Sequence, residues 1–192
     1  MQIIAGKLKG YKIVTDNKCD YRPTTAIVKE AIFNILSNGS FVENSESILK
    51  DAVTIDLFAG TGALTFEAIS RGAKYSILIE KDIKHFQMLN LNIEKFGLSE
   101  QVTVIKGDAT NLPHAKVKCK IAFIDPPFNQ KLVDPTLNSL VKKGWLEKDA
   151  IIVIETHFKD QYNPDYNFEE LFSRPYGHAL LKIYRFIGSS ND

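Results

Sequence analysis

Patterns that bind metals or form disulfides are scarce in this sequence. Its 192 residues include two cysteines, Cys19 and Cys119, and four histidines, none at the short spacings that hold zinc. We therefore expect no metal site and two reduced thiols, buried or half-buried, with a disulfide between the two cysteines as the open alternative.

Long apolar runs and an excess of charge of one sign are also missing. No stretch approaches the roughly 18 apolar residues of a membrane span, and residues 1–12 lack the apolar segment of a secretory signal. With 24 basic and 23 acidic residues the net charge is +1, so a nucleic-acid site would have to be a local patch. These absences predict a cytoplasmic protein with no membrane partner.

What the sequence does contain is an alternation of two patterns from Val53 onward. Short apolar runs rich in β-branched residues alternate with helical patterns, which predicts an α/β domain with a mostly parallel, doubly wound sheet. The expected strands are 53–58, 75–80, 102–105, 121–124 and 151–154, and the expected helices are 63–71, 83–96 and 131–141. Residues 167–172 and 179–187 predict two closing strands, joined tightly at 174–177, that give an antiparallel C-terminal edge.

Residues 1–47 are expected to form a small extension ahead of the domain at 48–192. Residues 1–4 and 11–14 flank a glycine-containing turn and predict a β-hairpin, while 25–37 predict a helix with Thr24 or Thr25 as its N-cap. Lys7, Lys9 and Lys12 lie on or beside this hairpin, where they form either a patch that faces RNA phosphates or an ordinary solvated surface.

Acidic residues end four successive predicted strands. The first strand leads into Asp56 and a loop with Gly60 and Gly62, whose glycines allow close approach of a ligand. Thr65 stands where a dinucleotide fingerprint has its third glycine, and Asp56 would repel a phosphate but favour a cationic sulfonium or ammonium group. The other strand ends carry Glu80, placed to accept both hydroxyls of a ribose, then Asp108 and Asp125.

The segment after the fourth strand suits a planar amine. In Asp125-Pro126-Pro127-Phe128, two rigid prolines without N–H donors place backbone carbonyls and a carboxylate beside an aromatic face. The alternative is a strand ended by a Pro-Pro turn without further function.

The order of these motifs resembles the class I S-adenosylmethionine-dependent methyltransferases. Over nearly the whole chain it is similar to the RsmD family, bacterial small-subunit rRNA guanine-N2 methyltransferases. The specific part is the pair Arg22-Pro23-Thr24-Thr25 and Asp125-Pro126-Pro127-Phe128. The other matching segments are 3–7 with Gly10, 28–34, 56–63, 67–73, 79–82 and 144–146.

The resemblance implies a seven-stranded Rossmann-like sheet, S-adenosylmethionine as cofactor, and ribosomal RNA or an assembling small subunit as partner of a monomer. The target base would meet Asp125, Pro126, Pro127 and Phe128. The implied cofactor-binding residues are Arg22, Thr24, Asp56, Phe58, Gly60, Gly62, Glu80, Lys81, Asp108, Ala109 and Asp125, and the implied RNA-binding residues are Lys7, Lys9, Lys12 and Arg22. Arg22 could bind an anion, which would be either the carboxylate of the cofactor or an RNA phosphate.

The sequence thus predicts methyl transfer to the exocyclic N2 of a guanine in 16S rRNA. A carboxylate matches the adjacent N1–H and N2–H donors of guanine better than it matches adenine. The alternatives are a DNA adenine-N6 or protein amine methyltransferase, or a non-catalytic assembly factor that binds S-adenosylmethionine. One departure from the family is at 154–157, where a second acidic residue after Glu155 is missing; we expect Glu155 and His157 to be surface residues.

Overall fold

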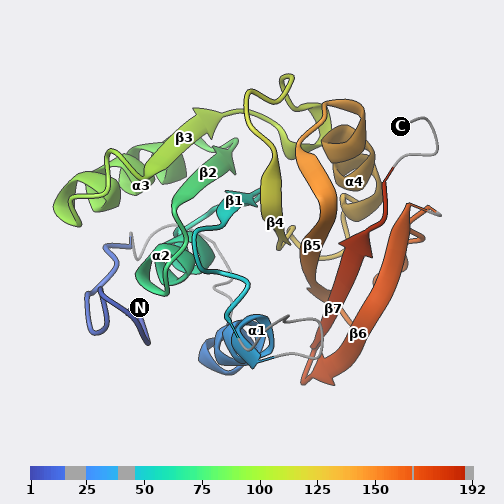
Figure 1. Ribbon diagram of the computed structural model, residues 1–192, viewed down its shortest axis with the longest axis horizontal. Helices are drawn as coiled ribbons and strands as arrows, with labels where there is room; N and C mark the ends of the chain where they lie inside the picture. Colours follow the sequence, from blue (N-terminus) through green and yellow to red (C-terminus); the bar gives the residue numbers. More distant parts are fainter. Residues whose placement is uncertain (16–24, 39–45, 166, 189–192) are drawn as a thin grey trace.

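A seven-stranded sheet forms the centre of the protein, in the order β3-β2-β1-β4-β5-β7-β6 (Figure 1). The computed structural model describes residues 1–15, 25–38, 46–165 and 167–188. The strands are β1 (Val53–Asp56), β2 (Tyr75–Glu80), β3 (Val102–Lys106), β4 (Cys119–Ile124), β5 (Leu146–His157), β6 (Phe168–Tyr176) and β7 (Ala179–Phe186). The helices are α1 (Ala26–Asn38), α2 (Ala63–Ser70), α3 (Ile83–Lys95), the short 3₁₀ helix η2 (Ala109–Asn111) and α4 (Val133–Lys142).

Strand direction confirms the predicted fold class. Strands β1 to β5 pair in parallel, whereas β7 runs antiparallel to β5 and β6 antiparallel to β7. This order with an antiparallel β7 is that of the class I methyltransferase fold.

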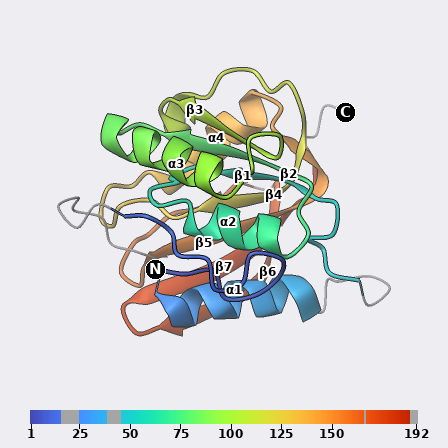
Figure 2. The ribbon, with the colours of Figure 1, turned by 90° about the vertical axis from the view of Figure 1, so that its left-hand side faces the viewer.

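Both faces of the sheet are covered by helices. In β4, Ile121 and Phe123 point to the core shared with α1, α2 and α3, while Ala122 and Ile124 point to the core shared with α4. Figure 2 shows α1, α2 and α3 together on one face, with α4 behind the sheet. Burial of alternate residues on opposite faces explains why these strands read as continuous apolar runs.

Two strands, β5 and β6, extend furthest beyond their apolar patterns. Strand β6 continues through Pro175, so the connection to β7 is the two-residue turn Gly177-His178 rather than 174–177. Proline is tolerated there because β6 is the edge of the sheet and its missing N–H breaks no inner ladder. Strand β5 begins at Leu146, where a shift of register beside Cys119 lets polar residues enter the strand.

The described N-terminal residues form a turn closed by a single isolated bridge, without the two strands of the expected β-hairpin. Ile3 N–H donates to Tyr11 O at 3.0 Å, and Gln2 and Lys12 form an antiparallel bridge. In the following helix, Thr25 Oγ1 accepts from Val28 N–H at 3.3 Å, so Thr25 serves as the N-cap; Thr24, the other candidate, lies outside the described residues.

A buried carboxylate in α2 holds this turn against that helix. Glu67 is fully buried, and its two oxygens accept the N–H groups of Ile4 at 2.8 Å and Ala5 at 3.0 Å. Arg71 Nε donates to the same carboxylate at 2.8 Å, and Lys29 Nζ lies 3.5 Å from it. Burial lowers the pKa of Lys29, and Glu67 opposes that shift.

The sequence predicted neither a membrane span nor a metal site, and the described residues contradict neither expectation. Across these residues, no helix has the length and apolar character to cross a membrane, and no cluster of three or more His, Cys, Asp or Glu side chains could hold a metal. Cys119 is a buried free thiol whose pKa is raised by burial to about 12, while Cys19 lies outside the described residues.

Candidate active site

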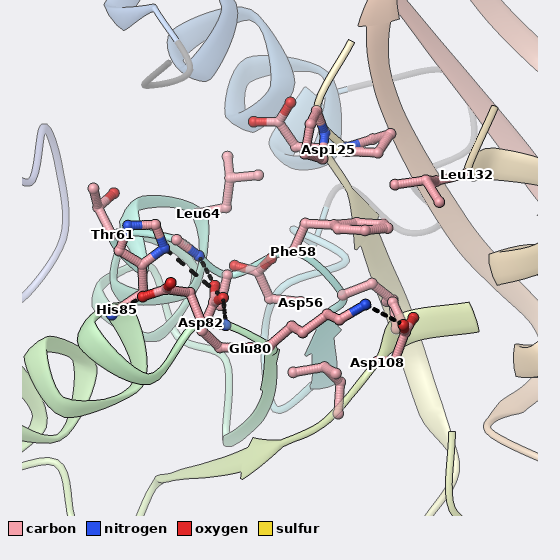
Figure 3. A pocket seen from close by; sticks show the side chains of 18 of the residues that line it. Asp56, Phe58, Thr61, Leu64, Glu80, Asp82, His85, Asp108, Asp125 and Leu132 are labelled. Atoms are coloured by element: carbon pink, nitrogen blue, oxygen red, sulfur yellow. Dashed lines mark hydrogen bonds and ion pairs between the residues drawn. The ribbon is translucent and has the colours of Figure 1, made fainter. Parts of the chain in front are cut away.

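A cavity of about 740 Å³ opens where β1, β2, β3 and β4 end (Figure 3). This volume falls within the range of small-molecule sites, and the carboxyl end of such a sheet is where α/β folds bind ligands. Eleven of the expected site residues line the cavity: Asp56, Phe58, Gly60, Glu80, Lys81, Asp108, Ala109, Asp125, Pro126, Pro127 and Phe128.

Three expected cofactor-binding positions lie away from the cavity or outside the described part of the chain. Gly62 does not line the cavity; it is the N-cap of α2, with φ of 76°. A Cβ there would come within 2.6 Å of Phe66 and 2.8 Å of Leu89, so Gly62 allows α2 to start close to α3. Arg22 and Thr24 lie outside the described residues.

Asp56 ends β1 at the floor of the cavity and is almost fully buried. Thr65 Oγ1 donates to its Oδ2 at 3.1 Å. Burial raises the pKa of Asp56 to about 7, with the nearby carboxylates of Asp125 and Glu80 adding to the rise and the Thr65 hydrogen bond opposing it. A cation in the cavity would therefore favour the ionised form of this group.

Glu80 ends β2 and shapes the glycine loop. Its Oε2 accepts from Gly60 N–H at 2.8 Å and its Oε1 from Asp82 N–H at 2.7 Å. His85, in the first turn of α3, places Nδ1 3.8 Å from Oε1. Since each carboxylate oxygen can accept more than one hydrogen bond, both oxygens keep acceptor capacity for a pair of hydroxyls.

Asp108 follows β3 and is fixed by two neighbours. Lys81 Nζ lies 2.8 Å from its carboxylate, and Thr110 donates to it from its backbone N–H at 2.9 Å and its hydroxyl at 2.7 Å. These contacts, led by Lys81, lower the pKa of Asp108 to about 2. The group is therefore an anion at any physiological pH.

The Asp125–Phe128 segment lies at the opposite side of the cavity from Glu80, as Figure 3 shows for Asp125. It follows β4 directly, and the pairing of Ile124 with Ile154 brings Asp125 level with Glu155 on β5. The Phe128 ring lies edge-on to the His157 ring, with 5.3 Å between centroids.

The expectation that Glu155 and His157 are surface residues is wrong. Glu155 is only 3% exposed and lines the cavity, and His157 is half-buried among aromatic rings. The physical reason is that β5 runs on to His157 and pairs there with β7, so both side chains are covered by neighbouring elements.

Several lining residues escaped the sequence reasoning. Asp82 accepts from the N–H groups of Lys84 at 2.8 Å and His85 at 3.1 Å, and so caps α3. An acidic N-cap two residues after Glu80 was a signal in the sequence that the first turn of this helix faces the cavity. No comparable pattern marked other lining residues, among them Thr61, Leu64, Gln130 and Leu132.

The hairpin lysines lie outside the cavity. Lys7, Lys9 and Lys12 are exposed, and Lys7 Nζ donates to Gln101 Oε1 at 2.8 Å. The start of the hairpin nevertheless borders the cavity, because Thr61 Oγ1 donates to Met1 Sδ at 3.6 Å.

Comparison with known proteins identifies the family. Residues 1–185 match the family described as Conserved hypothetical protein 95. The chain belongs to this family. It is 40% identical over 162 residues to ribosomal RNA small subunit methyltransferase D of Buchnera aphidicola subsp. Acyrthosiphon pisum, covering 82% of this chain and 78% of that protein. Against the Escherichia coli (strain K12) protein of the same description, identity is 33% over 160 residues, covering 83% and 76% of the two chains.

Solved structures agree with this membership. The yhhF structure from Escherichia coli aligns with a TM-score of 0.83 and 28% identity, over 98% of this chain and 99% of that one. A Salinibacter ruber RNA methyltransferase in complex with S-adenosyl-L-homocysteine aligns with a TM-score of 0.63 at 14% identity, which supports the fold alone. The family is one of methylases, and S-adenosylmethionine is its methyl donor, as the sequence predicted.

Proposed function

We propose that this protein transfers a methyl group from S-adenosylmethionine to the exocyclic N2 of a guanine in small-subunit (16S) ribosomal RNA. The observation that carries the proposal is the meeting of two groups at one cavity: the strand-end acids Asp56, Glu80 and Asp108, and the amine-binding segment Asp125–Phe128. The relatives described as ribosomal RNA small subunit methyltransferases support the choice of RNA.

The acidic side of the cavity fits the cofactor. When bound, S-adenosylmethionine supplies an electrophilic methyl group on a sulfonium. Asp56, beside the Gly60 loop, would favour the cationic methionine end, Glu80 would accept the ribose hydroxyls, and Asp108 would accept from the adenine amino group. Phe58, Lys81 and Ala109 line the same cavity. Roles for Arg22 and Thr24 remain predictions, because both lie outside the described residues.

The opposite side would orient the nucleobase. Asp125 would accept the N1–H and N2–H donors of guanine, and the Pro126 carbonyl would accept the second N2 hydrogen. Both acceptors would stabilise positive charge as it develops on the nitrogen during in-line displacement, after which the acidic methylated amine loses its proton to water. Phe128 would stack on the extruded base, a contact worth about 1–3 kcal/mol.

The N-terminal hairpin would position the RNA. Lys7, Lys9 and Lys12 are exposed on an element that borders the cavity through Met1 and Thr61. Such lysines contact phosphates without reading the base sequence. Selection of the target base would then fall to the Asp125–Phe128 segment. We expect the protein to act as a monomer in the cytoplasm.

The test is methyl incorporation into rRNA and small subunits from cells that lack this protein, with the modified base and atom mapped by mass spectrometry. We expect one N2-methylguanine in 16S rRNA. Methylation found only on DNA adenine or on a protein amine would overturn the proposal.

A further inference from the structure

Four aromatic and imidazole rings form a continuous group that begins at the cavity. The Phe128 ring contacts His157, whose ring lies 4.6 Å from Phe158 and 6.1 Å from His178, centroid to centroid. His157 and His178 are nearly parallel, with 9° between their planes, and Phe158 lies 6.2 Å from His178 at 26°. We call Phe128, His157, Phe158 and His178 the ring stack.

The ring stack leads from the cavity to the surface. Phe128 lines the cavity, His157 is half-buried at the end of β5, and Phe158 is 45% exposed. His178 is exposed in the turn between β6 and β7, which Figure 1 places beside the end of β5. The methyl-accepting side of the cavity therefore continues into an accessible surface of flat rings.

Backbone hydrogen bonds fix these rings in place. Asp160 accepts from Asn129 N–H at 3.2 Å and from His157 N–H at 3.1 Å, which ties the segment after Phe128 to the end of β5. Phe158 N–H donates to His178 O at 3.0 Å. A surface that is already ordered loses little conformational freedom when a ligand stacks on it.

One cationic side chain lies over a ring of the stack, and a second lies over Tyr176, outside the stack but next to the turn that carries His178. Lys159 Nζ is 5.6 Å from the centre of the Phe158 ring, and Arg174 Cζ is 5.6 Å from the centre of Tyr176, which precedes the turn that carries His178. Flat rings flanked by cations are the combination with which proteins hold single-stranded nucleic acid, since bases stack and phosphates pair with the charges.

We propose that the ring stack binds a nucleobase adjacent to the methylated guanine. When the target guanine turns into the cavity, the adjacent base loses the base on which it stacked. Phe158 and His178 would offer that adjacent base a new stacking surface outside the cavity. The inference rests on the proposed function, because it takes the substrate to be RNA. The base bound by the ring stack would be unpaired and next to the target guanine in the same RNA strand.

The experiment measures methyl transfer to 16S rRNA and to isolated small subunits with Phe158→Ala, His178→Ala and the ring-preserving Phe158→Tyr. We expect KM for RNA to rise on the order of 10-fold in each alanine variant, with kcat and KM for S-adenosylmethionine unchanged and Phe158→Tyr close to wild type. Leu91→Ala, which shortens an apolar side chain that is 56% exposed on α3, is the matched control. Binding of S-adenosylhomocysteine checks that each variant is folded.

The outcomes separate the two proposals. If the wild-type protein methylates no RNA, the proposed function fails and the inference fails with it. If the wild type methylates RNA and both alanine variants keep its KM, the inference alone is wrong. A rise in KM on subunits but not on naked rRNA would assign the ring stack to a ribosomal protein and would likewise overturn it.

Discussion

Gly60 and Glu80 join two strands of the sheet through one hydrogen bond of 2.8 Å, from the loop N–H to the carboxylate. Gly60 follows β1 with φ of 49°, and Glu80 ends β2. The carboxylate that is expected to bind the ribose therefore also sets the shape of the loop that is expected to bind the methionine end.

Because Glu80 has both roles, we expect Glu80→Gln to lower affinity for the cofactor by more than the loss of the carboxylate charge alone would. The amide has one acceptor oxygen, so the Gly60 and Asp82 N–H groups cannot both keep their partners. We expect S-adenosylhomocysteine affinity to fall about 10- to 100-fold and unfolding free energy to fall by about 1–3 kcal/mol. Calorimetry and urea unfolding measure the two effects, with exposed Glu100→Gln as the control. Unchanged affinity would contradict the assignment of Glu80.

Asp56 predicts a pH dependence with a definite sign. Its pKa is raised from 3.8 to about 7 in the folded protein, so the folded state prefers the protonated form. The stabilisation is complete below about pH 4 and is lost as pH rises through 7. We expect wild type to lose roughly 2–3 kcal/mol between pH 5 and 8 relative to Asp56→Asn, measured by urea unfolding at each pH without cofactor. Parallel curves for the two proteins would refute this.

The same ionisation links pH to the cofactor. A bound sulfonium or ammonium favours the charged form of Asp56. Affinity for S-adenosylmethionine should therefore increase as pH rises through about 7 in wild type, while in Asp56→Asn it should be weaker and nearly independent of pH. Titration calorimetry across this range decides the matter, and a wild-type affinity that falls with pH would argue against a cation beside Asp56.

Asp125 separates an enzyme from a cofactor-binding module. Because its expected task is to orient the amine and stabilise developing charge, Asp125→Ala should lower kcat at least about 100-fold, while cofactor affinity changes by only several-fold. Asp125→Asn keeps the shape but loses the charge, and should fall between wild type and Asp125→Ala. Single-turnover methyl transfer measures the rates. Equal rates in all three proteins would remove Asp125 from the mechanism.

Gly6 and Gly10 form a matched pair for testing how the hairpin docks. Both have left-handed φ, 80° and 86°, but a Cβ at Gly6 would lie 1.8 Å from Ser70 O, whereas one at Gly10 meets nothing within 4 Å. Gly10→Ala should cost about 1–2 kcal/mol from backbone strain alone, and Gly6→Ala should cost more because the hairpin must move off α2. Urea unfolding compares the two variants, and equal losses would mean that close approach to Ser70 is unimportant.

Short continuous apolar runs, and the acidic residues near their ends, allowed the sheet and the acidic side of the cavity to be predicted from the sequence. Asp56 and Glu80 each follow an apolar run directly, and Asp108 follows one after Lys106 and Gly107. Parallel strands bring such ends together at one edge. The extension of β5 could not be predicted, because Glu147 and Lys148 interrupt its apolar pattern and lie where the register with β4 is irregular.

The burial of Glu155 could not be predicted from the sequence, because it too depends on tertiary structure. A carboxylate after an apolar strand is ordinarily solvated, but here β5 continues past Glu155 and pairs it with Leu181 of β7 inside the sheet. The ring stack also depends on tertiary pairing, since His157 and His178 are separated by a whole strand and meet through the register of His157 with Ala179.

The attachment of the hairpin has a consequence for synthesis on the ribosome. Ile4 and Ala5 find their hydrogen-bond acceptor only at Glu67, 63 and 62 residues later in the chain. At bacterial elongation rates of roughly 5–20 residues per second, the leading segment must wait several seconds for its docking site to emerge. The hairpin that carries Lys7, Lys9 and Lys12 can therefore dock only after α2 has been translated.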